Sequence, residues 1–582
     1  MRTIFIALLL GAATPALAAP ADDLKTVIDD HWAWYLKENP IQATLVGVRD
    51  YDRELGDFSL AAQDRRAAEA AAFIKRLDAI PDSGLHAAQR TNKAILRRSL
   101  AEAVEANGFG ARMMLFSSTN SFHQFLPELG NFMPLRTKAD YESYLARLGK
   151  IPALMDEAIT ISRQAVEGGF TQPCVTLEGF EPTITAEIKA DPAQSRFYAP
   201  FAGRRPDAIA EADWQAMQAR AREIVTAGIN PAYTRFATFF REDYMPGCRK
   251  DIAATSLPQG KEYYAFQVRQ MTTTDLTPEE IHQIGLDEVK RIRGEMEALA
   301  RKAGYPSREA FIQVLRTDPK YYAKTPEELM EYVSRQAKII DGKMPGIVGT
   351  PARLPYGVRE IPAANAETQT TAYYFPGSTE SGLAGFYYVN TSKLDQRPLW
   401  EVPVLTIHEA VPGHHQQLAL QQELDLPEFR KHAAFFTAFI EGWGLYSERL
   451  GIEMELYDTP EKEMGRLSYD MWRACRLVVD TGMHAKGWTR DQAVAFMKDN
   501  SALTDANIDA EINRYIGWPG QALAYKIGQL KILELRQKAE KELGAKFDLR
   551  RFHDAVLGQG SVPLDVLERQ ISDWIAAEKA KA

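Results

Sequence analysis

The chain has 582 residues, enough to bury a large core, and this length predicts two domains or one large two-lobed body. Hydrophobic residues make up 45% of the sequence and charged residues 25%, the proportions of a soluble globular protein. The net charge of −9 gives no electrostatic basis for binding nucleic acid or an anionic membrane. We therefore expect no nucleic-acid partner. The sequence carries no signal for an oligomeric state.

The N-terminus has the features of a secretory signal peptide. Arg2 precedes the apolar run 4–13, and a small-x-small cleavage site follows at 16–18. No later run reaches the roughly 18 apolar residues of a membrane span. We expect residues 1–18 to be removed by a cut near Ala18, and the mature chain to be exported to a bacterial periplasm without a membrane span.

The residues after the signal peptide divide at a tract rich in proline, glycine and serine, Met245–Gly260. Before it, residues 19–245 mostly show the spacing of amphipathic helices and predict an N-terminal helical lobe. After it, residues 261–582 form the predicted C-terminal lobe. Its first segment, Lys261–Met271, is predicted to be a short strand.

Three cysteines are present, and an exported protein can form one disulfide from them. Cys174 and Cys248 both lie in predicted loops, T-Q-P-C and M-P-G-C. Cys475 lies in an apolar segment typical of a buried helix. We hypothesise a Cys174–Cys248 disulfide and a buried thiol at Cys475.

Three of the ten histidines fall in the motif I-H-E-A-V-P-G-H-H-Q-Q at 407–417. Neutral imidazole is a good zinc ligand, and zinc hydrolases keep a general base beside the first ligand. His408 and Glu409 supply this pair of groups. The usual motif, H-E-x-x-H, has its second histidine four residues after the first, where this sequence has Pro412.

The second ligand is therefore His414 or His415. A spacing of seven returns to the same face of a regular helix but about 10 Å further along its axis. A spacing of six requires the helix to widen or break, which Pro412 and Gly413 favour. We favour His408 and His414 as ligands, with His415 as the alternative to His414. The competing interpretation is that these are ordinary polar residues at a helix end.

Glu441 is the candidate third ligand. It ends a stretch of eight uncharged residues, 33 positions after His408, on a second predicted helix. A buried carboxylate is costly unless it is paired or bound to metal. Gly442 and Gly444 would let that helix approach the first one closely. The alternative is a structural glutamate paired with arginine or tyrosine, and Glu448 is a candidate for supporting a ligand.

Two aromatic runs, Gln369–Phe375 and Gly385–Asn390, flank P-G-S-T-E-S-G-L and predict a hairpin just before the His408 helix. Its edge could take up an extended peptide as a further strand. Tyr373 and Tyr374 are the candidate substrate-binding residues of this hairpin. The alternative is a small sheet that only packs.

The predicted helix Glu461–Lys486 carries a polar stripe between apolar residues. The stripe consists of Asp470, Arg473, Asp480 and His484. Such a stripe is most often a solvated face. In a cleft, His484 could stabilise an oxyanion, and Arg473 or Arg476 could bind a carboxylate.

Tyrosines flank a helix break at Pro519-Gly520. Tyr515 and Tyr525 are candidate phenolic donors to a tetrahedral intermediate. The alternative is that both belong to the core.

Six motifs together resemble the domain-of-unknown-function 885 family over nearly the whole mature chain. They are Y-D-R-E-L-G-D-F-S at 51–59, T-T-T-D-L-T-P-E-E at 272–280, H-E-A-V-P-G-H-H at 408–415, E-G-W-G-L-Y-S-E at 441–448, R-A-C-R-L-V-V-D-T-G-M-H at 473–484 and P-G-Q-A-L-A-Y-K at 519–526. The resemblance implies a mainly α-helical, zincin-like metallohydrolase related to the gluzincin peptidases, with a small sheet or hairpin beside its active-site helix. It implies one zinc ion held by His408, His414 and Glu441, with Glu409 as general base. The sequence departs from the gluzincin spacing at the second ligand.

These observations favour a periplasmic zinc metallopeptidase that hydrolyses short peptides, with residues 261–582 as its catalytic lobe. Glu409 would take a proton from the attacking water and pass it to the leaving amine. Two alternatives stay open. One is a zinc hydrolase acting on a non-peptide amide or ester, and the other is a non-catalytic binding protein with a vestigial site.

Overall fold

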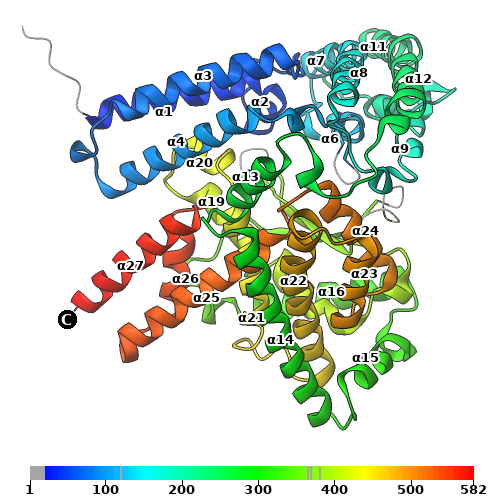
Figure 1. Ribbon diagram of the computed structural model, residues 1–582. Helices are drawn as coiled ribbons and strands as arrows, with labels where there is room; N and C mark the ends of the chain where they lie inside the picture. The colour runs from blue at the N-terminus through cyan, green and yellow to red at the C-terminus, as the bar shows by residue number, and fades with distance from the viewer. Residues whose placement is uncertain (1–19, 118–120, 363–365, 367–369, 379–381, 582) are drawn as a thin grey trace, which may run out of the picture.

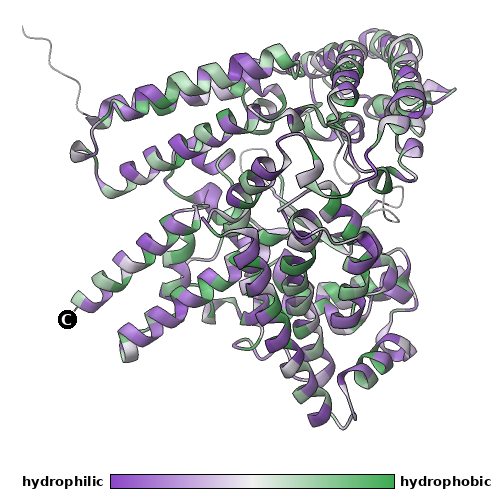
Figure 2. Ribbon diagram, in the orientation of Figure 1, coloured by the Kyte–Doolittle hydropathy of each residue, from purple (hydrophilic) through white to green (hydrophobic). Residues whose placement is uncertain are grey.

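The computed structural model describes residues 20–581 apart from 118–120, 363–365, 367–369 and 379–381. The predicted signal peptide lies outside the described residues. The chain is mostly α-helical with one small sheet, as Figure 1 shows, which confirms the predicted mainly α fold. Hydrophilic and hydrophobic residues alternate along the long helices, as expected for helices with one buried face (Figure 2).

The helices before residue 245 occupy the upper part of the view in Figure 1. They are α1 (Pro20–Glu38), α2 (Pro40–Leu45), α3 (Leu60–Asp78), α4 (Ala87–Asn107), α5 (Phe122–Phe125), α6 (Leu129–Phe132), α7 (Lys138–Leu148), α8 (Ile151–Gly168), α9 (Glu181–Thr185), α10 (Ala199–Ala202), α11 (Glu211–Glu223) and α12 (Asn230–Phe239).

The elements that follow form most of the lower part of the molecule in Figure 1. The first of them are α13 (Gly260–Thr272), α14 (Pro278–Lys302), α15 (Arg308–Thr317), α16 (Pro326–Asp341), β1 (Tyr356–Glu360), β2 (Ala372–Phe375) and β3 (Gly385–Val389). The remaining helices are α18 (Val402–Glu409), α19 (His414–Glu423), α20 (Glu428–His432), α21 (Thr437–Leu450), α22 (Pro460–Ala485), α23 (Arg490–Asn500), α24 (Asp505–Gly517), α25 (Leu523–Leu543), α26 (Leu549–Leu557) and α27 (Leu564–Ala580).

The segment Lys261–Met271, predicted to be a strand, is instead part of helix α13. Its aromatic residues have high strand propensity, but its buried side chains Tyr264, Val268 and Thr272 recur every four residues, which is the spacing of a helix face. The prediction of a strand was therefore wrong, because burial on one helix face outweighed the local propensity.

The sheet has the strand order β1-β3-β2. β2 and β3 are antiparallel, with Tyr373 opposite Tyr388 and Tyr374 opposite Tyr387, which confirms the predicted hairpin. Strand β1, which pairs in parallel with β3, was not predicted. β2 is an edge strand, since no other strand among the described residues pairs with its outer side.

Three hydrophobic cores organise the described residues. One lies among α7, α8, α11 and α12 and the segments joining them. A second joins α14, α15, α16, α18, α22 and α24. The third combines α1, α3 and α4 with α13, α21, α25, α26 and α27. The first helices thus share a core with the last ones, across the predicted division into lobes 19–245 and 261–582, and that division stays a prediction.

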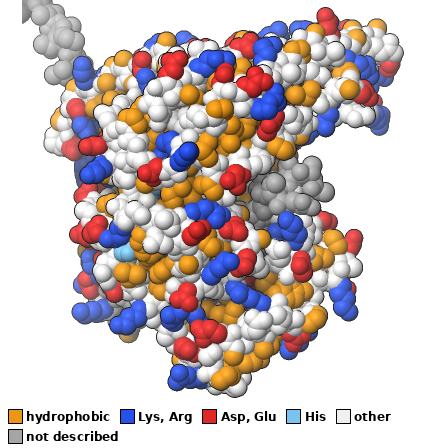
Figure 3. Space-filling view, turned by 45° about the vertical axis from the view of Figure 1, so that its right-hand side comes forward, with side chains coloured by type: hydrophobic (Ala, Val, Ile, Leu, Met, Phe, Trp, Pro, Cys, Tyr) orange, Lys and Arg blue, Asp and Glu red, His pale blue; other side chains and the backbone are white. Residues whose placement is uncertain are grey.

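Cys174 and Cys248 form a disulfide with their Cα atoms 5.1 Å apart, which confirms the hypothesis drawn from their loops. Cys475 is a buried free thiol on α22, also as predicted. No helix among the described residues is long and apolar enough to cross a membrane. On the face shown in Figure 3, basic and acidic side chains are interspersed rather than segregated.

Candidate metal centre

The motif at 407–417 forms a broken helix. α18 ends at Glu409 and α19 begins at His414, so His408 lies in the last turn of one helix and His414 is the first residue of the next. The peptide bond between Val411 and Pro412 is cis. The backbone N–H of Gly413 donates to the carbonyl of Ile407 across the break at 3.0 Å.

Gly413 is required at this break by its close contacts. A Cβ atom at this position would lie 2.0 Å from the carbonyl oxygen of His408 and 2.4 Å from that of Ile407. Trp443 of α21 fixes the same loop by donating its indole N–H to the carbonyl of Pro412 at 2.7 Å. The break predicted from Pro412 and Gly413 is therefore present, whereas the anchoring role of Trp443 had no sequence signal beyond its aromatic character.

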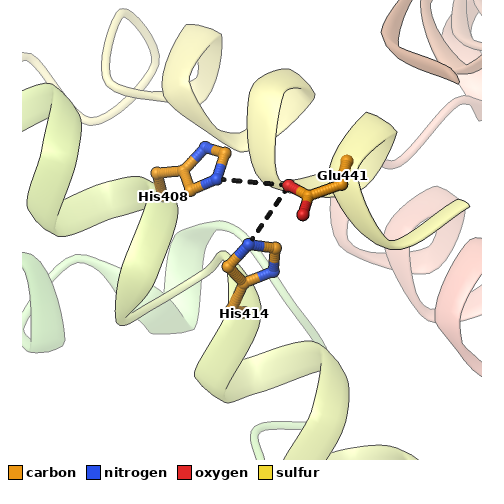
Figure 4. Close-up of side chains that lie close together, drawn as sticks. All are labelled: His408, His414 and Glu441. Carbon is orange, nitrogen blue, oxygen red and sulfur yellow. Dashed lines mark ion pairs between the residues drawn. The ribbon is translucent and has the colours of Figure 1, made fainter. Parts of the chain in front are cut away.

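His408, His414 and Glu441 converge at this break, as Figure 4 shows. Oε2 of Glu441 lies 3.6 Å from Nε2 of His408 and 3.5 Å from Nε2 of His414. The three candidate ligand atoms lie within 4.8 Å of one another, and the described residues contain no other such group of three. The arrangement could hold a metal ion, and it joins the two histidines that we favoured with the predicted glutamate.

The electrostatics of the cluster favour a cation between its ligand atoms. Burial opposes the charged form of His408, but the carboxylates of Glu441, Glu448 and Glu409 outweigh it and raise the pKa of this histidine to about 9. Burial raises the pKa of Glu441, but the neighbouring His414 and His408 outweigh it and hold that pKa well below its usual range. Oε2 of Glu441 and Nδ1 of His414 are buried, and neither has a hydrogen-bond partner among the described residues.

Two glycines let α21 lie close to two different neighbouring helices. A Cβ atom on Gly444 would lie 2.8 Å from Cε1 of His408, and a Cβ atom on Gly442 would lie 2.6 Å from Cα of Gly528 on α25. The first glycine makes room for the imidazole and the second for the neighbouring helix. The contact of Gly444 agrees with the expected close approach to the His408 helix, whereas Gly442 packs against α25.

His415 lies outside the cluster, because both of its ring nitrogens have other partners. Nδ1 is 2.8 Å from the hydroxyl of Tyr374, and Nε2 is 2.9 Å from the carbonyl oxygen of Leu354. Burial lowers the pKa of His415 to about 4. Its imidazole connects α19 to β2, and the alternative assignment of His415 as a ligand has no geometric support.

The two predicted substrate-binding tyrosines of β2 face opposite sides of the sheet. Tyr374 contacts His415, whereas Tyr373 stacks on Tyr388 with ring centroids 4.9 Å apart. Neither side chain is part of the His-His-Glu cluster. Their contribution to substrate binding stays a prediction.

Glu409, the predicted general base, is the last residue of α18. It is buried, and within the described part of the chain it makes no hydrogen bond or ion pair. Burial raises the pKa of Tyr387 of β3, and Glu409 adds to that increase. Glu409 also contributes, after Glu441 and Glu448, to the raised pKa of His408. A buried carboxylate without a structural partner, adjacent to the first candidate ligand, is available for proton transfer.

The polar stripe of α22 is buried rather than solvated. Asp470 accepts from Nζ of Lys526 at 2.6 Å, and Asp480 accepts from the hydroxyl of Tyr264 at 2.7 Å. Nδ1 of His484 accepts from the backbone N–H of Ala254 at 2.9 Å.

The other ring nitrogen of His484 lies 3.0 Å from the carbonyl oxygen of Tyr515. Since backbone groups use both ring nitrogens, His484 has no free donor for an oxyanion. His484 thus makes structural contacts in this geometry, and its predicted catalytic role stays an untested prediction.

The two arginines of the stripe have separate acidic partners. Nη2 of Arg473 lies 3.0 Å from Oε1 of Glu448, and Nη2 of Arg476 lies 3.0 Å from Oε2 of Glu511. Tyr515 belongs to the second pair, because its hydroxyl donates to Glu511 at 2.5 Å and accepts from Arg476 at 2.8 Å. Both arginines and Tyr515 therefore belong to buried structural pairs in this geometry, and their predicted roles at the site stay untested predictions.

Tyr525 differs from Tyr515 in having a nearly unengaged hydroxyl. Its one hydrogen bond is a long one from Nε2 of Gln521, at 3.5 Å. Burial raises the pKa of Tyr525, and the charge of Glu441 adds to the increase. Of the two predicted phenolic donors, Tyr525 is the one whose hydroxyl has no strong structural partner among the described residues, and its role stays a prediction.

These features define a mainly α-helical protein with a candidate metal centre built from two histidines and a glutamate at a helix break. The chain belongs to the family described as bacterial proteins of unknown function, DUF885, whose profile matches residues 40–571. This match confirms the resemblance seen in the sequence motifs. The comparison with curated proteins gives no significant match.

Two solved structures are similar over nearly their whole length. A candidate lipoprotein from Colwellia psychrerythraea is 28% identical with a TM-score of 0.90, covering 96% of this chain and 100% of its own. A candidate lipoprotein of unknown function from Shewanella oneidensis is 21% identical with a TM-score of 0.71, with the same coverage of 96% and 100%. The second likeness shows the fold alone.

Proposed function

We propose that the protein is an exported zinc-dependent metallopeptidase that hydrolyses short peptides. The observation that carries this proposal is the convergence of His408, His414 and Glu441 beside Glu409, a buried carboxylate with no structural partner among the described residues. A purely structural metal site needs no such base.

The donor set suits zinc. Two ligand atoms on one tetrahedral zinc ion lie roughly 3.3 Å apart, given bond lengths of about 2.0–2.1 Å. The observed separations of 3.5 and 3.6 Å are close to that value and longer than a usual hydrogen bond. Three protein ligands leave a fourth position for water or substrate, as in catalytic zinc sites. Zinc, when bound there, supplies a Lewis acid that polarises the substrate carbonyl and promotes ionisation of water.

The chain's own groups complete the reaction. Glu409 takes a proton from the attacking water and delivers it to the leaving nitrogen. Tyr525, whose hydroxyl makes only one long hydrogen bond among the described residues, donates a hydrogen bond to the developing oxyanion. The metal would be held by three residues from three helices, namely His408 of α18, His414 of α19 and Glu441 of α21.

A peptide substrate is supported by the edge strand β2. Among the described residues, no strand pairs with the outer side of β2. The strand β2 also contacts helix α18, which carries the first candidate ligand. An extended peptide can bind such an edge through main-chain hydrogen bonds. Export is supported by the likeness to the Colwellia psychrerythraea candidate lipoprotein and by the signal-peptide features of residues 1–18.

The test combines metal analysis with peptide digestion. The purified mature protein should contain about one zinc per chain by elemental analysis. It should also cleave members of a mixed peptide pool, with the products identified by mass spectrometry. Glu409→Gln should keep the zinc and lose activity by about 100-fold or more.

Glu423→Gln is the matched control, because Glu423 is a carboxylate of α19 that pairs with Arg353 outside the cluster. This variant should keep both zinc and activity. Failure to take up zinc, or full activity in Glu409→Gln, would overturn the proposal. Zinc binding with cleavage of amide or ester model compounds but no peptides would point to a non-peptide substrate.

A further inference from the structure

Helix α21 contacts both nitrogens of one imidazole. Glu441 and Glu448 lie two turns apart on this helix. Oε2 of Glu441 is 3.6 Å from Nε2 of His408, and Oε1 of Glu448 is 2.8 Å from Nδ1 of the same ring. Gly444 lies between the two carboxylates and leaves room for the ring. One helix therefore holds the opposite edges of the first candidate ligand.

Glu448 is held in turn by Arg473 of α22. Nη2 of Arg473 lies 3.0 Å from Oε1 of Glu448, the oxygen that also meets Nδ1 of His408. The guanidinium carbon lies 4.6 Å from the ring centroid of Tyr469 and 4.4 Å from that of Trp472. Nη1 of Arg473 donates to the carbonyl of Tyr469 at 3.3 Å, so two ring contacts and a hydrogen bond position the guanidinium.

The pair is buried, and its charges depend on each other. Glu448 is 2% and Arg473 is 3% exposed. A carboxylate removed from water requires a compensating charge and hydrogen bonds. Oε2 of Glu448 has no hydrogen-bond partner among the described residues, so the histidine and the arginine both act on Oε1. Arg473 thus places a guanidinium group against the carboxylate oxygen that meets the imidazole.

We infer that Glu448 and Arg473 are positioning residues that set the metal affinity of the site. Glu448 accepts a hydrogen bond from the Nδ1–H group of His408. The lone pair of Nε2 is then directed at the position between His414 and Glu441. The carboxylate also makes the imidazole a stronger donor to a cation, and Arg473 fixes the carboxylate. The inference rests on the metal site of the proposed function and does not depend on the substrate.

The experiment measures zinc affinity directly. Wild-type protein and variants are stripped of metal and titrated with zinc in competition with a chromophoric chelator of known affinity. Loss of a group that orients a ligand typically weakens metal binding by about 10- to 100-fold. We expect that loss for Glu448→Ala. Glu448→Gln should bind zinc more tightly than Glu448→Ala, because its amide oxygen can still accept a hydrogen bond from the Nδ1–H group of His408.

Arg473→Gln should weaken zinc binding, and Arg473→Lys should restore part of the loss. Arg476→Gln is the matched control, because Arg476 is equally buried on the same helix and also lies over Trp472, but pairs with Glu511. The Arg476→Gln variant should have lower thermal stability. Its zinc affinity should stay within about twofold of wild type, since the contacts of His408 with Glu441 and Glu448 are unchanged.

Wild-type zinc affinity in Glu448→Ala, or an equal loss of affinity in Arg476→Gln and Arg473→Gln, would overturn the inference. If Arg473→Gln does not fold, the test is the zinc affinity of the near-isosteric variant Glu448→Gln compared with that of Glu448→Ala. A wild-type protein that binds zinc and cleaves no peptide would overturn the proposed function and leave this inference standing.

Discussion

The imidazole of His408 lies against the α-carbon of Gly444, so close that a Cβ atom at residue 444 would be 2.8 Å from Cε1 and 3.1 Å from Nε2 of the ring. This contact brings α21 near enough for Glu441 and Glu448 to reach the same imidazole. A glycine of the helix therefore determines whether the candidate ligands can meet.

Gly444→Ala should displace the His408 ring and weaken zinc binding. The added methyl group must also be accommodated in a packed interior, which typically costs about 1–3 kcal/mol of stability. Gly294→Ala is the control, because Gly294 is an exposed position of α14 whose added Cβ would meet nothing within 4 Å. It should raise stability by about 0.5–1 kcal/mol through helix propensity. Chelator competition and thermal unfolding give both values, and unchanged zinc affinity in Gly444→Ala would contradict the prediction.

Tyr525→Phe should lower kcat by about 100-fold or more while keeping zinc content and KM near the wild-type values, because it removes the proposed oxyanion donor. The variant Tyr515→Phe is the comparison that distinguishes the roles of the two tyrosines. The hydroxyl of Tyr515 is bound by Glu511 and Arg476, so this variant should mainly lose stability, by about 1–3 kcal/mol. Steady-state kinetics on a peptide identified from the pool provide the measurement. A larger loss of kcat in Tyr515→Phe than in Tyr525→Phe would contradict the assignment.

Removal of the disulfide should destabilise the protein. The bridge closes a loop with a sequence separation of 74 residues, for which chain entropy gives about 4 kcal/mol. Cys174→Ser with Cys248→Ser should lower the denaturant midpoint accordingly. Denatured, unreduced wild-type protein should show one free thiol, that of Cys475, and three after reduction. Three thiols before reduction would show that the bridge is not formed in solution.

Asp480 should make stability fall as the pH rises. Burial raises the pKa of this carboxyl from 3.8 to about 7, despite the hydrogen bonds from Tyr264 and Gly520 and the charge of Arg514. The folded protein therefore binds a proton more tightly than the unfolded chain. The stability from this proton is complete below about pH 4 and is lost as the pH approaches 7, at about 1.4 kcal/mol per pH unit.

Asp480→Asn removes that dependence, because an amide oxygen can still accept both hydrogen bonds without ionising. Relative to wild type, the variant should gain up to about 4 kcal/mol of stability between pH 4 and pH 8. Chemical unfolding at several pH values measures the difference. If the free energy of unfolding changes with pH in the same way in both proteins, the raised pKa of Asp480 is contradicted.

The candidate ligands could be predicted from the sequence because each breaks a local rule. Pro412 and Gly413 interrupt an apolar helix between two histidines, and Glu441 is a lone charge after eight uncharged residues. Local conflicts of this kind often mark functional positions, since packing alone does not favour them. The choice between His414 and His415 needed the structure, because it depends on the direction of α19 after the break.

The roles of Arg473 and Arg476 could not be predicted. They are the same residue type on one face of one helix, and only their partners distinguish them. Glu448 comes from α21 and Glu511 from α24, so each pairing is a tertiary contact with no local signal. β1 was missed for a similar reason, because its pairing with β3 joins segments that are not adjacent in the sequence.

The shared core of the first and last helices has a consequence for how the polypeptide reaches its native state. Asn92 on α4 accepts a hydrogen bond from Arg430, 338 residues later, and Arg98 of the same helix pairs with Asp565 at the start of α27. Leu24, Ile95 and Leu100 are buried in the same core as Ile571 and Ile575.

During synthesis, the earliest helices therefore emerge with apolar faces that only the final segments can cover. Contacts between distant parts of a chain form slowly, and exposed apolar surface invites aggregation in the interval. Truncation of the C-terminal helices should thus leave the N-terminal ones dependent on a holding chaperone, even though they are far from the cut in sequence.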